Sequence, residues 1–509
     1  MNGAELLLGE AALERRGQRI ALVCGEERVS MAALAERVRR SAGAYLAHGV
    51  RPGERVMLLM RDTPECAAAW LGAVHAGAVA VALNGKLPEA DYRHILADSE
   101  AKLVLVEDVF ARARPDLTAE LSAQGRVAVA GEGAPPGASW RAWLQDAREA
   151  ASPATGPDDP AFALYSSGTT GRPKGIVHSH KVFGHVGKAF DAFGLEAGET
   201  VFSTSRLFFA YGMEHGLLAP LAMGMTSILC AEWSETDAVI ELVERHRPAA
   251  LFSVPTVYRR LLAEPRPRLE AFRGVRRFIA AGERLSPKLV DQWRSAVGAE
   301  LLNLYGMSET FCACIVTPPS SSDGMRTGLP LSGVEVRLAD AHEREPARGQ
   351  PGVLWVRHPA QAEGYANLPE QTQAQFRDGW FCSRDLFVRD DADYFVHQGR
   401  SDELVKVAGQ WVQPGELEET AALEAAVSEA ACVPVVDADG LERLALFVTA
   451  RGDADEAVRA AAAACERALP RHKRPKWVRS VPELPRTATG KVQRYKLREL
   501  LERELAGRE

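Results

Sequence analysis

The sequence predicts an α/β protein in which parallel or mixed sheets are flanked by helices, ending in a compact α+β unit. Amphipathic helical patterns alternate with short apolar strands over about the first 150 residues, as they do in parallel sheets. At 509 residues the chain is too long for one hydrophobic core, so we expect several domain-sized units. Near the C-terminus, alanine-rich helices alternate with short strands such as Leu444 to Ala450.

The first elements are clearly marked. Met31 to Val50 has apolar residues at helical spacing and a glycine near its end, and Arg55 to Met60 is typical of a buried strand. Cys66 to Asn84 is predicted to form a helix, a glycine break and a strand. Glu149 to Ala161, rich in Pro, Gly, Ala and Asp, is predicted to be a linker.

Composition indicates a soluble globular protein whose partners are small molecules. The net charge of −7 and the lack of basic runs exclude a general nucleic-acid binder. We expect no secretory signal and no membrane span, since no stretch has the required length and apolarity; Leu218 to Cys230 is better explained as core. Eight cysteines without paired spacing favour a reducing cytoplasm, and Cys312 and Cys314, which lack a second ligand pair, are predicted to be buried.

The most informative stretch is LYSSGTTGRPKGIVHSH, from Leu164 to His180. An apolar strand opens into a loop whose glycines let the backbone approach an anion, whose hydroxyls add donors, and whose Lys174 adds a positive charge. Because Lys174 is followed by Gly175 and not by Ser or Thr, a Walker-type loop is not indicated. We predict that this loop binds a polyphosphate through Ser166, Ser167, Gly168, Thr169, Thr170, Gly171 and Lys174.

The order of these residues carries a resemblance. SSGTTGRPKG resembles the phosphate loop of the adenylate-forming superfamily, which includes acyl-CoA and aryl-CoA synthetases, nonribosomal adenylation domains and luciferases. The resemblance extends over nearly the whole chain. It implies a large N-terminal domain of several subdomains (residues 1–400) that binds ATP and an acid, and a small mobile α+β domain (residues 401–509). It also implies ATP, Mg²⁺ and coenzyme A.

Three further segments resemble parts of the superfamily's nucleotide site. In LLNLYGMSET, Tyr305 resembles the adenine-stacking tyrosine, and Glu309 is the predicted Mg²⁺ ligand because a carboxylate beside a triphosphate suits this ion. GWFCSRDLF supplies Asp385 for the ribose hydroxyls, although Arg384 replaces the usual glycine. AAGE lines the adenine and carboxylate end of the site in relatives. The nucleotide contacts implied outside the loop are Ala281, Gly282, Glu283, Tyr305, Gly306, Met307, Ser308, Asp385 and Arg400.

The C-terminal part carries two more motifs. In HQGRSDELVKVAGQWVQPGELE, Arg400 resembles the ribose and phosphate contact, Asp402 the hinge and Gly409 the glycine of the pantetheine tunnel. PRTATGK resembles the motif whose lysine reaches back into the active site, so Lys491 is the predicted catalytic lysine. It would act with Thr170, Lys174 and Glu309.

The acid pocket resembles that of the benzoate-CoA ligase branch through FFAYG. It lacks the aspartate that holds an ammonium in amino-acid-adenylating relatives, so a neutral, ring-bearing acid fits better. Glu214 and His215 leave two alternatives open: a solvated helix face, or inward groups that hydrogen-bond a ring hydroxyl or amino group. The predicted pocket residues are Ala210, Tyr211, Glu214, His215, Ala280, Cys312 and Ala313.

The resemblance implies an AMP-forming ligase that activates a small carboxylic acid, of the substituted benzoate type, and transfers it to coenzyme A. Three alternatives stay open: transfer to a carrier-protein pantetheine, activation of nitrite with an aryl amine as acceptor, and a nucleotide-binding regulator without chemistry. We expect neither nucleic acid nor membrane as a partner. The oligomeric state is open, a homodimer included.

Overall fold

The computed structural model describes residues 2–167, 172–233, 235–340, 342–407, 410–437, 440–486 and 492–506. Its contacts divide the chain into two compact units. The first comprises Met1–Arg337, Trp355–Ser383 and Arg389–Val396, and the second comprises Leu338–Leu354, Arg384–Val388 and His397–Glu509.

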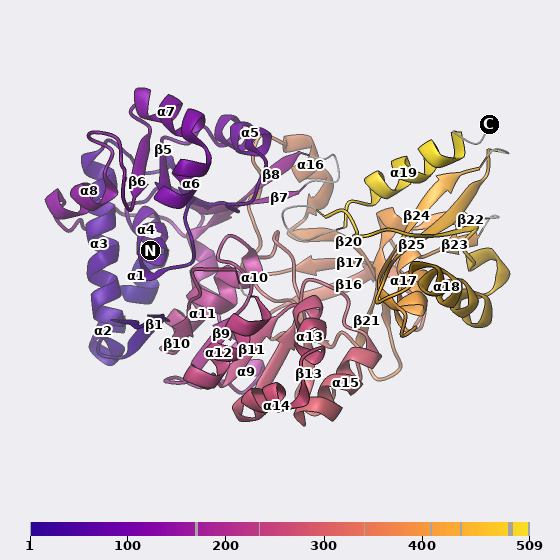
Figure 1. Cartoon of the computed structure of the whole chain (residues 1–509). Helices are drawn as coiled ribbons and strands as arrows, with labels where there is room; N and C mark the ends of the chain where they lie inside the picture. The colour runs from indigo at the N-terminus through magenta and orange to yellow at the C-terminus, as the bar shows by residue number, and fades with distance from the viewer. Residues whose placement is uncertain are drawn as a thin grey trace. The chain divides into compact units, whose positions relative to one another are not determined.

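A seven-stranded sheet fills the N-terminal part of the first unit (Figure 1). In the order β18-β8-β7-β4-β3-β5-β6, the strands from β7 to β6 are parallel, and β8 and β18 are antiparallel to their neighbours. The strands are β3 (Arg55–Leu59), β4 (Val79–Ala82), β5 (Leu103–Glu107), β6 (Val127–Ala130), β7 (Pro160–Ser167), β8 (Pro173–Ser179) and β18 (Gly364–Tyr365). Its helices are α3 (Met31–Ala47), α4 (Pro64–His75), α5 (Glu89–Ser99), α6 (Asp108–Ala113), α7 (Pro115–Ala123) and α8 (Trp140–Asp146).

A nine-stranded sheet forms the rest of the unit's core, in the order β15-β14-β13-β12-β11-β9-β10-β1-β2. From β13 to β1 neighbouring strands are parallel. The strands are β1 (Ile20–Cys24), β2 (Glu27–Ser30), β9 (Thr200–Ser203), β10 (Thr226–Ile228), β11 (Ala250–Ser253), β12 (Arg277–Ala280), β13 (Leu301–Tyr305), β14 (Ile315–Val316) and β15 (Leu329–Pro330). Its helices are α1 (Gly3–Leu8), α2 (Glu10–Arg16), η1 (His180–Gly184), α9 (Lys188–Ala192), α10 (Ala210–Met213), η2 (Glu214–Leu218), α11 (Ala219–Met223), α12 (Thr236–His246), α13 (Pro255–Leu262), α14 (Arg266–Leu269), η3 (Glu270–Gly274) and α15 (Pro287–Val297).

Both sheets pack on one continuous core. Leu58 of β3, Trp70 of α4 and Phe252 of β11 belong to the same buried cluster. Helix α4 is rich in alanine and buried along nearly its whole length. Its small side chains let neighbouring elements of the core pack close to the helix backbone. The outer faces have their own clusters, one of which packs the nine-stranded sheet against α12, α13 and α15 (Figure 1).

Five further strands and one helix follow. They are β16 (Glu335–Ala339), β17 (Pro351–Arg357), α16 (Pro369–Gln375), β19 (Phe376–Arg377), β20 (Trp380–Arg389) and β21 (Phe395–Arg400). Four of these strands, β16, β17, β20 and β21, have residues in both units, because the chain passes from one unit to the other within them.

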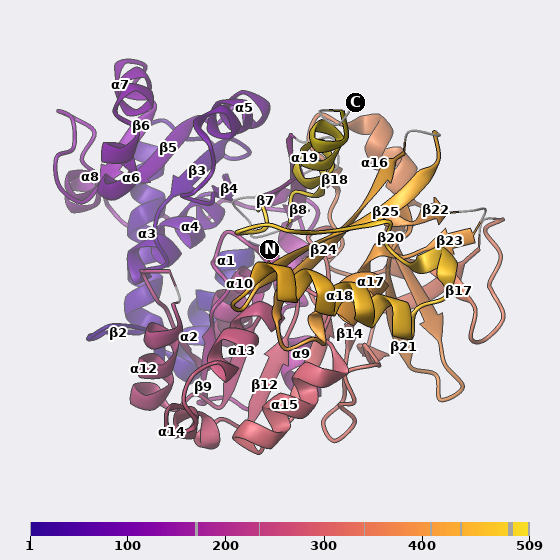
Figure 2. The same ribbon diagram turned by 45° about the vertical axis from the view of Figure 1, so that its right-hand side comes forward.

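The second unit ends in an α+β fold. Its three-stranded sheet has the order β24-β25-β26, with α17 and α18 packed on one face and α19 on the other (Figure 2). Two short strands, β22 and β23, pair in an antiparallel ladder. The elements are η4 (Ser401–Glu403), β22 (Val405–Val407), β23 (Gln410–Val412), α17 (Pro414–Ala422), β24 (Val427–Val436), β25 (Glu442–Ala450), α18 (Ala454–Ala468), η5 (Arg471–Lys473), β26 (Trp477–Ser480) and α19 (Arg494–Ala506).

The predicted fold class is confirmed. Helix α3 and strand β3 fall within the predicted segments. Residues 147–159 between α8 and β7 form no helix or strand, which agrees with the predicted linker except at its end, where Pro160 and Ala161 already belong to β7. The 218–230 segment is largely buried, as expected of core. Within the described ranges, no helix combines the length and the apolarity that crossing a lipid bilayer requires.

Candidate active site

The loop predicted to bind a polyphosphate joins two antiparallel strands. Register pairs Ser166 of β7 with Lys174 of β8, and Ser167 with Pro173. The connection is therefore a hairpin and not the strand-to-helix turn of a Walker-type loop, in agreement with the sequence. Four predicted contacts in the connection lie outside the described residues: Gly168, Thr169, Thr170 and Gly171.

Lys174 and Glu309 lie together at the end of this hairpin. The Lys174 ammonium is 3.4 Å from Oε1 of Glu309, and both side chains are about 15% exposed (15% and 14%). The hydroxyl of Tyr365 donates to the same Oε1 at 2.8 Å, and the ammonium lies 3.7 Å from the centre of the Tyr365 ring. Tyr365 also contacts the side-chain amide of Gln375 at 2.7 Å. The predicted phosphate-binding cation and the predicted metal-binding carboxylate thus share one aromatic neighbour.

Strand pairing explains why these residues meet. Strand β18 pairs with β8 so that Tyr365 lies opposite Ile176, two residues after Lys174. The segment after β13 is held on β8 by His178, whose Nε2–H donates to the Ser308 carbonyl at 2.8 Å. Tyr365 was not predicted as a site residue because nothing in its local sequence marks it. To predict it, one would have to know that the strand containing Tyr365 pairs with β8.

The other predicted residues of this unit follow parallel strands at their carboxyl ends, where ligands bind in open α/β sheets. Ala280 to Glu283 follow or end β12, and Tyr305 to Ser308 follow or end β13. Glu283 is exposed, and its carboxylate accepts from the N–H and hydroxyl of Thr256 at the start of α13. Its side chain is therefore held by Thr256.

Tyr211 stands at the same edge. Its hydroxyl lies 3.3 Å from the carbonyl of Ser253 and 3.2 Å from that of Ile279, at the ends of β11 and β12. Ala210, the first residue of α10, precedes it, and Ala280 is fully buried next to Ile279. These three predicted pocket residues are therefore brought together.

Glu214 and His215 are buried, with exposures of 2% and 1%, so the solvated helix face is wrong. They begin the π-helical turn η2, which follows α10 directly. The Glu214 carboxyl is hydrogen-bonded by the thiol of Cys312 and the N–H of Ala313. This contact joins Glu214 to the two small residues that were predicted to close the acid pocket. Single-turn π-helices are frequent at functional sites.

Burial keeps both groups neutral. It raises the pKa of Glu214 to about 8, against the opposite effect of its hydrogen bonds to Cys312 and Ala313. Burial lowers the pKa of His215 to about 4, although the hydrogen bond to the Tyr211 carbonyl opposes this. Nδ1 of His215 lies 3.6 Å from Glu214, but with these pKa values the contact joins neutral groups near pH 7 and is not an ion pair. This turn thus carries two buried polar groups without a net charge near pH 7.

In the second unit, Arg400 links two of the predicted carboxylates. Its Nε and Nη2 donate to the two oxygens of Asp402 at 2.9 and 3.0 Å, and Nη1 lies 3.5 Å from Asp385. Arg384 has φ of +61°, in the left-handed region that glycine occupies without cost. The replacement of the usual glycine therefore leaves a glycine-like backbone. Gly409 and Lys491 lie outside the described residues.

Cysteines and histidines form no metal cluster in the part of the chain that is described. No three His, Cys, Asp or Glu side chains come close enough to hold an ion by themselves. Cys312 and Cys314 are buried, as predicted, and the Cys314 thiol lies 3.2 Å from the Thr310 hydroxyl. His178 and His180 are buried, and each makes a hydrogen bond, as expected of ordinary histidines.

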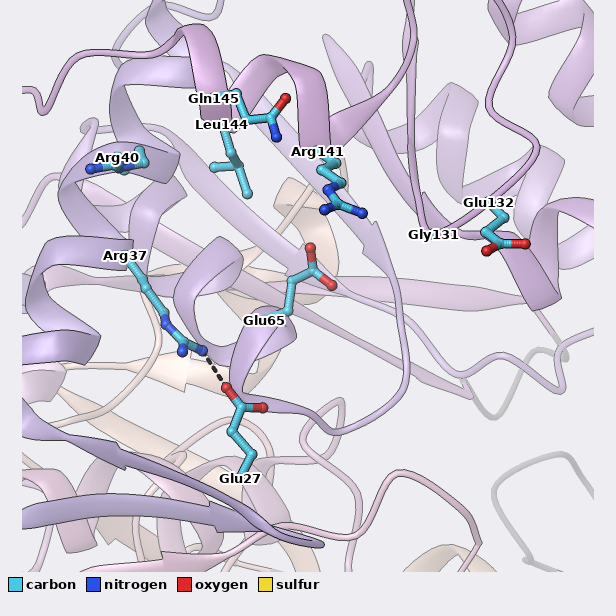
Figure 3. Close-up of a pocket in the computed structure, with 9 residues that line it drawn as sticks. All are labelled: Glu27, Arg37, Arg40, Glu65, Gly131, Glu132, Arg141, Leu144 and Gln145. Carbon is cyan, nitrogen blue, oxygen red and sulfur yellow. Dashed lines mark hydrogen bonds and ion pairs between the residues drawn. The ribbon is translucent and has the colours of Figure 1, made fainter.

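A surface pocket of about 780 Å³ lies elsewhere in the first unit (Figure 3). It contains none of the predicted site residues. Three glutamates and three arginines line it, and one pair of them, Glu27 and Arg37, forms an ion pair at 2.7 Å. Since opposite charges balance and partly pair there, the pocket favours no class of ligand. The lining residues are Glu27, Arg37, Arg40, Glu65, Gly131, Glu132, Arg141, Leu144 and Gln145.

The predicted phosphate loop connects two antiparallel strands, its lysine lies beside a carboxylate, and the second unit ends in an α+β fold. The chain matches the AMP-binding enzyme family over residues 9–366 and the C-terminal domain of AMP-binding enzymes over residues 416–491. It therefore belongs to the family of AMP-binding enzymes.

Several of the similar proteins within this family are named for aromatic acids. The chain is 38% identical to a 3-hydroxybenzoate–CoA ligase of Aromatoleum sp. (strain CIB), over 98% of this chain and 97% of that protein. A benzoate CoA ligase from Burkholderia xenovorans LB400 has a TM-score of 0.88 at 33% identity, covering 98% of this chain and 100% of that one. The anthranilate CoA ligase AuaEII, solved with anthranoyl-AMP, has a TM-score of 0.92 at 28% identity, covering 99% and 98%.

Replacing Glu214 by Gln should stabilise the protein increasingly as the pH rises. Below about pH 4.5 the carboxyl is protonated both in the native and in the unfolded chain. Between pH 4.5 and about 8 the Glu214 carboxyl ionises only in the unfolded chain. The free energy of unfolding of the wild type therefore falls by up to about 1.4 kcal/mol per pH unit, whereas that of the Gln variant does not. Urea denaturation at pH 5 and pH 8 measures this difference. Glu241→Gln, at a side chain that is 67% exposed, is the control and should show no such trend.

Proposed function

We propose that the protein is an ATP-dependent ligase that activates an aromatic carboxylic acid as its acyl-adenylate and transfers it to coenzyme A. The contact of Lys174 with Glu309 beside the hairpin loop carries this proposal, because it joins a phosphate-binding cation to a carboxylate. The names of the similar proteins support the aromatic acid and coenzyme A.

The chemistry needs two displacements. A carboxylate oxygen of the acid attacks the α-phosphorus of ATP, the bond to the bridging oxygen breaks, and pyrophosphate leaves. The sulfur of coenzyme A then attacks the acyl carbon, AMP leaves and the thiol proton is released. Catalysis of the first step is mainly positioning and neutralisation of developing phosphate charge, for which Lys174, the loop and Lys491 are the proposed groups.

Mg²⁺ fits the residues present. This ion commonly uses one or two carboxylates and completes its shell with water and substrate phosphates, and Glu309 supplies one carboxylate beside the loop. When bound, the ion would neutralise charge on the phosphates. The Tyr365 hydroxyl fixes the orientation of the Glu309 carboxylate, and Lys174 balances its charge until the nucleotide arrives.

The acid pocket accounts for the choice of an aromatic acid. The small side chains of Ala210, Ala280 and Ala313 favour a pocket that admits a ring, and neutral Glu214 and His215 offer no charge partner for an ammonium. A substituted benzoate satisfies both conditions. In the second unit, Asp385 and Arg400 are the proposed ribose contacts and Asp402 the hinge. Gly409 is the proposed glycine of the thiol tunnel.

The function is tested by pyrophosphate release with ATP, Mg²⁺ and a panel of benzoates, hydroxybenzoates, aminobenzoates and cinnamates. We expect release with aryl acids and stoichiometric thioester when coenzyme A is present. If a thioester forms only with a carrier protein, the acceptor is the pantetheine of that protein and not coenzyme A. If product forms only with nitrite and an aryl amine, the enzyme activates nitrite and the amine is the acceptor. ATP binding without acid-dependent exchange of pyrophosphate into ATP would indicate a regulator instead of an enzyme.

Lys491→Ala should abolish acid-dependent pyrophosphate release, by roughly 100-fold or more, while ATP still binds, because one charge on the developing phosphate is lost. Lys496→Ala removes an exposed lysine five residues on and is the matched control. Pyrophosphate release and ATP binding by calorimetry are the measurements. Wild-type release by the Lys491 variant would remove this lysine from the mechanism.

Tyr365→Phe should raise the Mg²⁺ concentration for half-maximal pyrophosphate release about tenfold. The variant keeps the ring beside the Lys174 ammonium and loses only the hydroxyl that donates to Glu309. Mg²⁺ titration of the rate and Mn²⁺ binding with ATP, followed by electron paramagnetic resonance, are the two readouts. Tyr495→Phe, at a half-exposed tyrosine, is the control. An unchanged Mg²⁺ titration would show that the hydroxyl does not orient Glu309.

A further inference from the structure

We infer that Nε2 of His215 accepts a hydrogen bond from a donor group on the aromatic ring of the acid, which makes His215 a specificity-determining residue. The preferred acid therefore carries a hydroxyl or amino group, and not merely any substituent of that size. This inference rests on the proposed function and specifies the substrate class of the same site.

The tautomer of His215 follows from its neighbour. Nδ1 lies 3.0 Å from the carbonyl oxygen of Tyr211, four residues before it. A carbonyl oxygen can only accept, so Nδ1 carries the hydrogen. Because burial keeps the ring neutral, Nε2 has no hydrogen and presents a lone pair. Nε2 is therefore an acceptor.

This acceptor is buried and unsatisfied. His215 is 1% exposed, and no group in the described parts of the chain hydrogen-bonds its Nε2. The ring is surrounded by aromatic side chains, with centroids 4.8 Å away for Phe252, 4.9 Å for Tyr211 and 5.8 Å for Phe190. Native proteins rarely leave a buried polar atom unpaired, because its lost hydration is not replaced. A donor on the ligand would satisfy Nε2.

His215 lies among the residues that were predicted to line the acid pocket. Its ring packs on Tyr211, a predicted wall of the pocket, and its neighbour Glu214 is bound by Cys312 and Ala313, which were predicted to close it. A π-helical turn starts at Glu214, so both side chains lie where the helix departs from regular spacing. The protonated carboxyl of Glu214 adds a second neutral polar group to the same turn.

The chemistry separates substituents of similar size. Hydroxyl and amino groups donate a hydrogen bond, whereas methoxy, fluoro, chloro and nitro groups do not. A site built around a buried hydrogen-bonding atom discriminates strongly against an analogue that leaves this atom unpaired. Wild-type enzyme should therefore favour its best hydroxybenzoate over benzoate, and over the methoxybenzoate of the same ring position, by roughly tenfold or more in kcat/KM. This comparison needs no substitution, so it tests the inference even if a variant fails to fold.

Two variants isolate Nε2. His215→Asn can keep the hydrogen bond to the Tyr211 carbonyl but has no atom at the place of Nε2, and His215→Gln can bring an amide oxygen there. The Asn variant should lose roughly 10- to 100-fold in kcat/KM for the hydroxybenzoate and less than about threefold for benzoate. The Gln variant should recover part of the loss. KM for ATP should stay unchanged in both.

His180→Asn is the matched control. His180 is also 1% exposed, and its Nε2 also lacks a partner, but its Nδ1 accepts from the N–H of Gly3 and not from a pocket residue. Its substitution should alter stability and leave the ratio of hydroxybenzoate to benzoate unchanged.

The outcomes separate the inference from the function. If the wild type activates aryl acids but prefers methoxybenzoate as much as hydroxybenzoate, or if His215→Asn keeps the wild-type ratio, the inference is wrong and the ligase stands. An equal loss for all acids would also contradict the inference, because benzoate has no ring donor for Nε2 to accept. If no aryl acid supports pyrophosphate release, the proposed function fails, and the inference fails with it.

Discussion

The two sheets of the first unit meet where β8 lies against the segment that follows β13, and the predicted nucleotide site depends on this junction. A hydrogen bond from the buried His178 to the Ser308 carbonyl joins the two segments. Because β8 also forms one side of the hairpin loop, the bond sets Glu309 beside Lys174. The edge strand β18 then adds Tyr365. Lys174 and Glu309, which are more than a hundred residues apart in the sequence, thus lie side by side where β8 contacts both the segment after β13 and β18.

Much of this arrangement could be predicted from sequence because its signals are local. Alternating helices and strands indicate a parallel sheet, and ligands of such sheets bind at the carboxyl ends of strands. The segments at the ends of β12 and β13 and the loop after β7 can therefore each be identified from their own local sequence. The lack of Ser or Thr after Lys174 correctly excluded a Walker-type loop, which the hairpin register explains. Lys491 and Gly409 remain predictions.

What could not be predicted depends on distant partners. Helical spacing could not decide whether Glu214 and His215 face solvent, because the answer depends on Cys312, Ala313 and Phe252, which come from other elements. Tyr365 acquires its place from strand pairing alone. At Arg384 the motif departs from glycine, yet φ stays positive, with the Ser401 hydroxyl donating to the Arg384 carbonyl at 2.8 Å. Tertiary contacts hold a conformation that the local sequence disfavours.

Four imidazoles of the first unit, those of His178, His180, His215 and His358, are each less than a tenth exposed. Burial lowers their pKa values to between about 3 and about 4, from the usual 6.5. As acidity rises below pH 6.5, the unfolded chain takes up protons that the native chain refuses, at up to about 1.4 kcal/mol per site and pH unit. The buried carboxyls of Glu214 and Asp62, whose pKa values burial raises to about 8 and about 6, act in the opposite direction. The dependence of the protein's stability on pH is therefore set in part by which titratable side chains are packed in its interior.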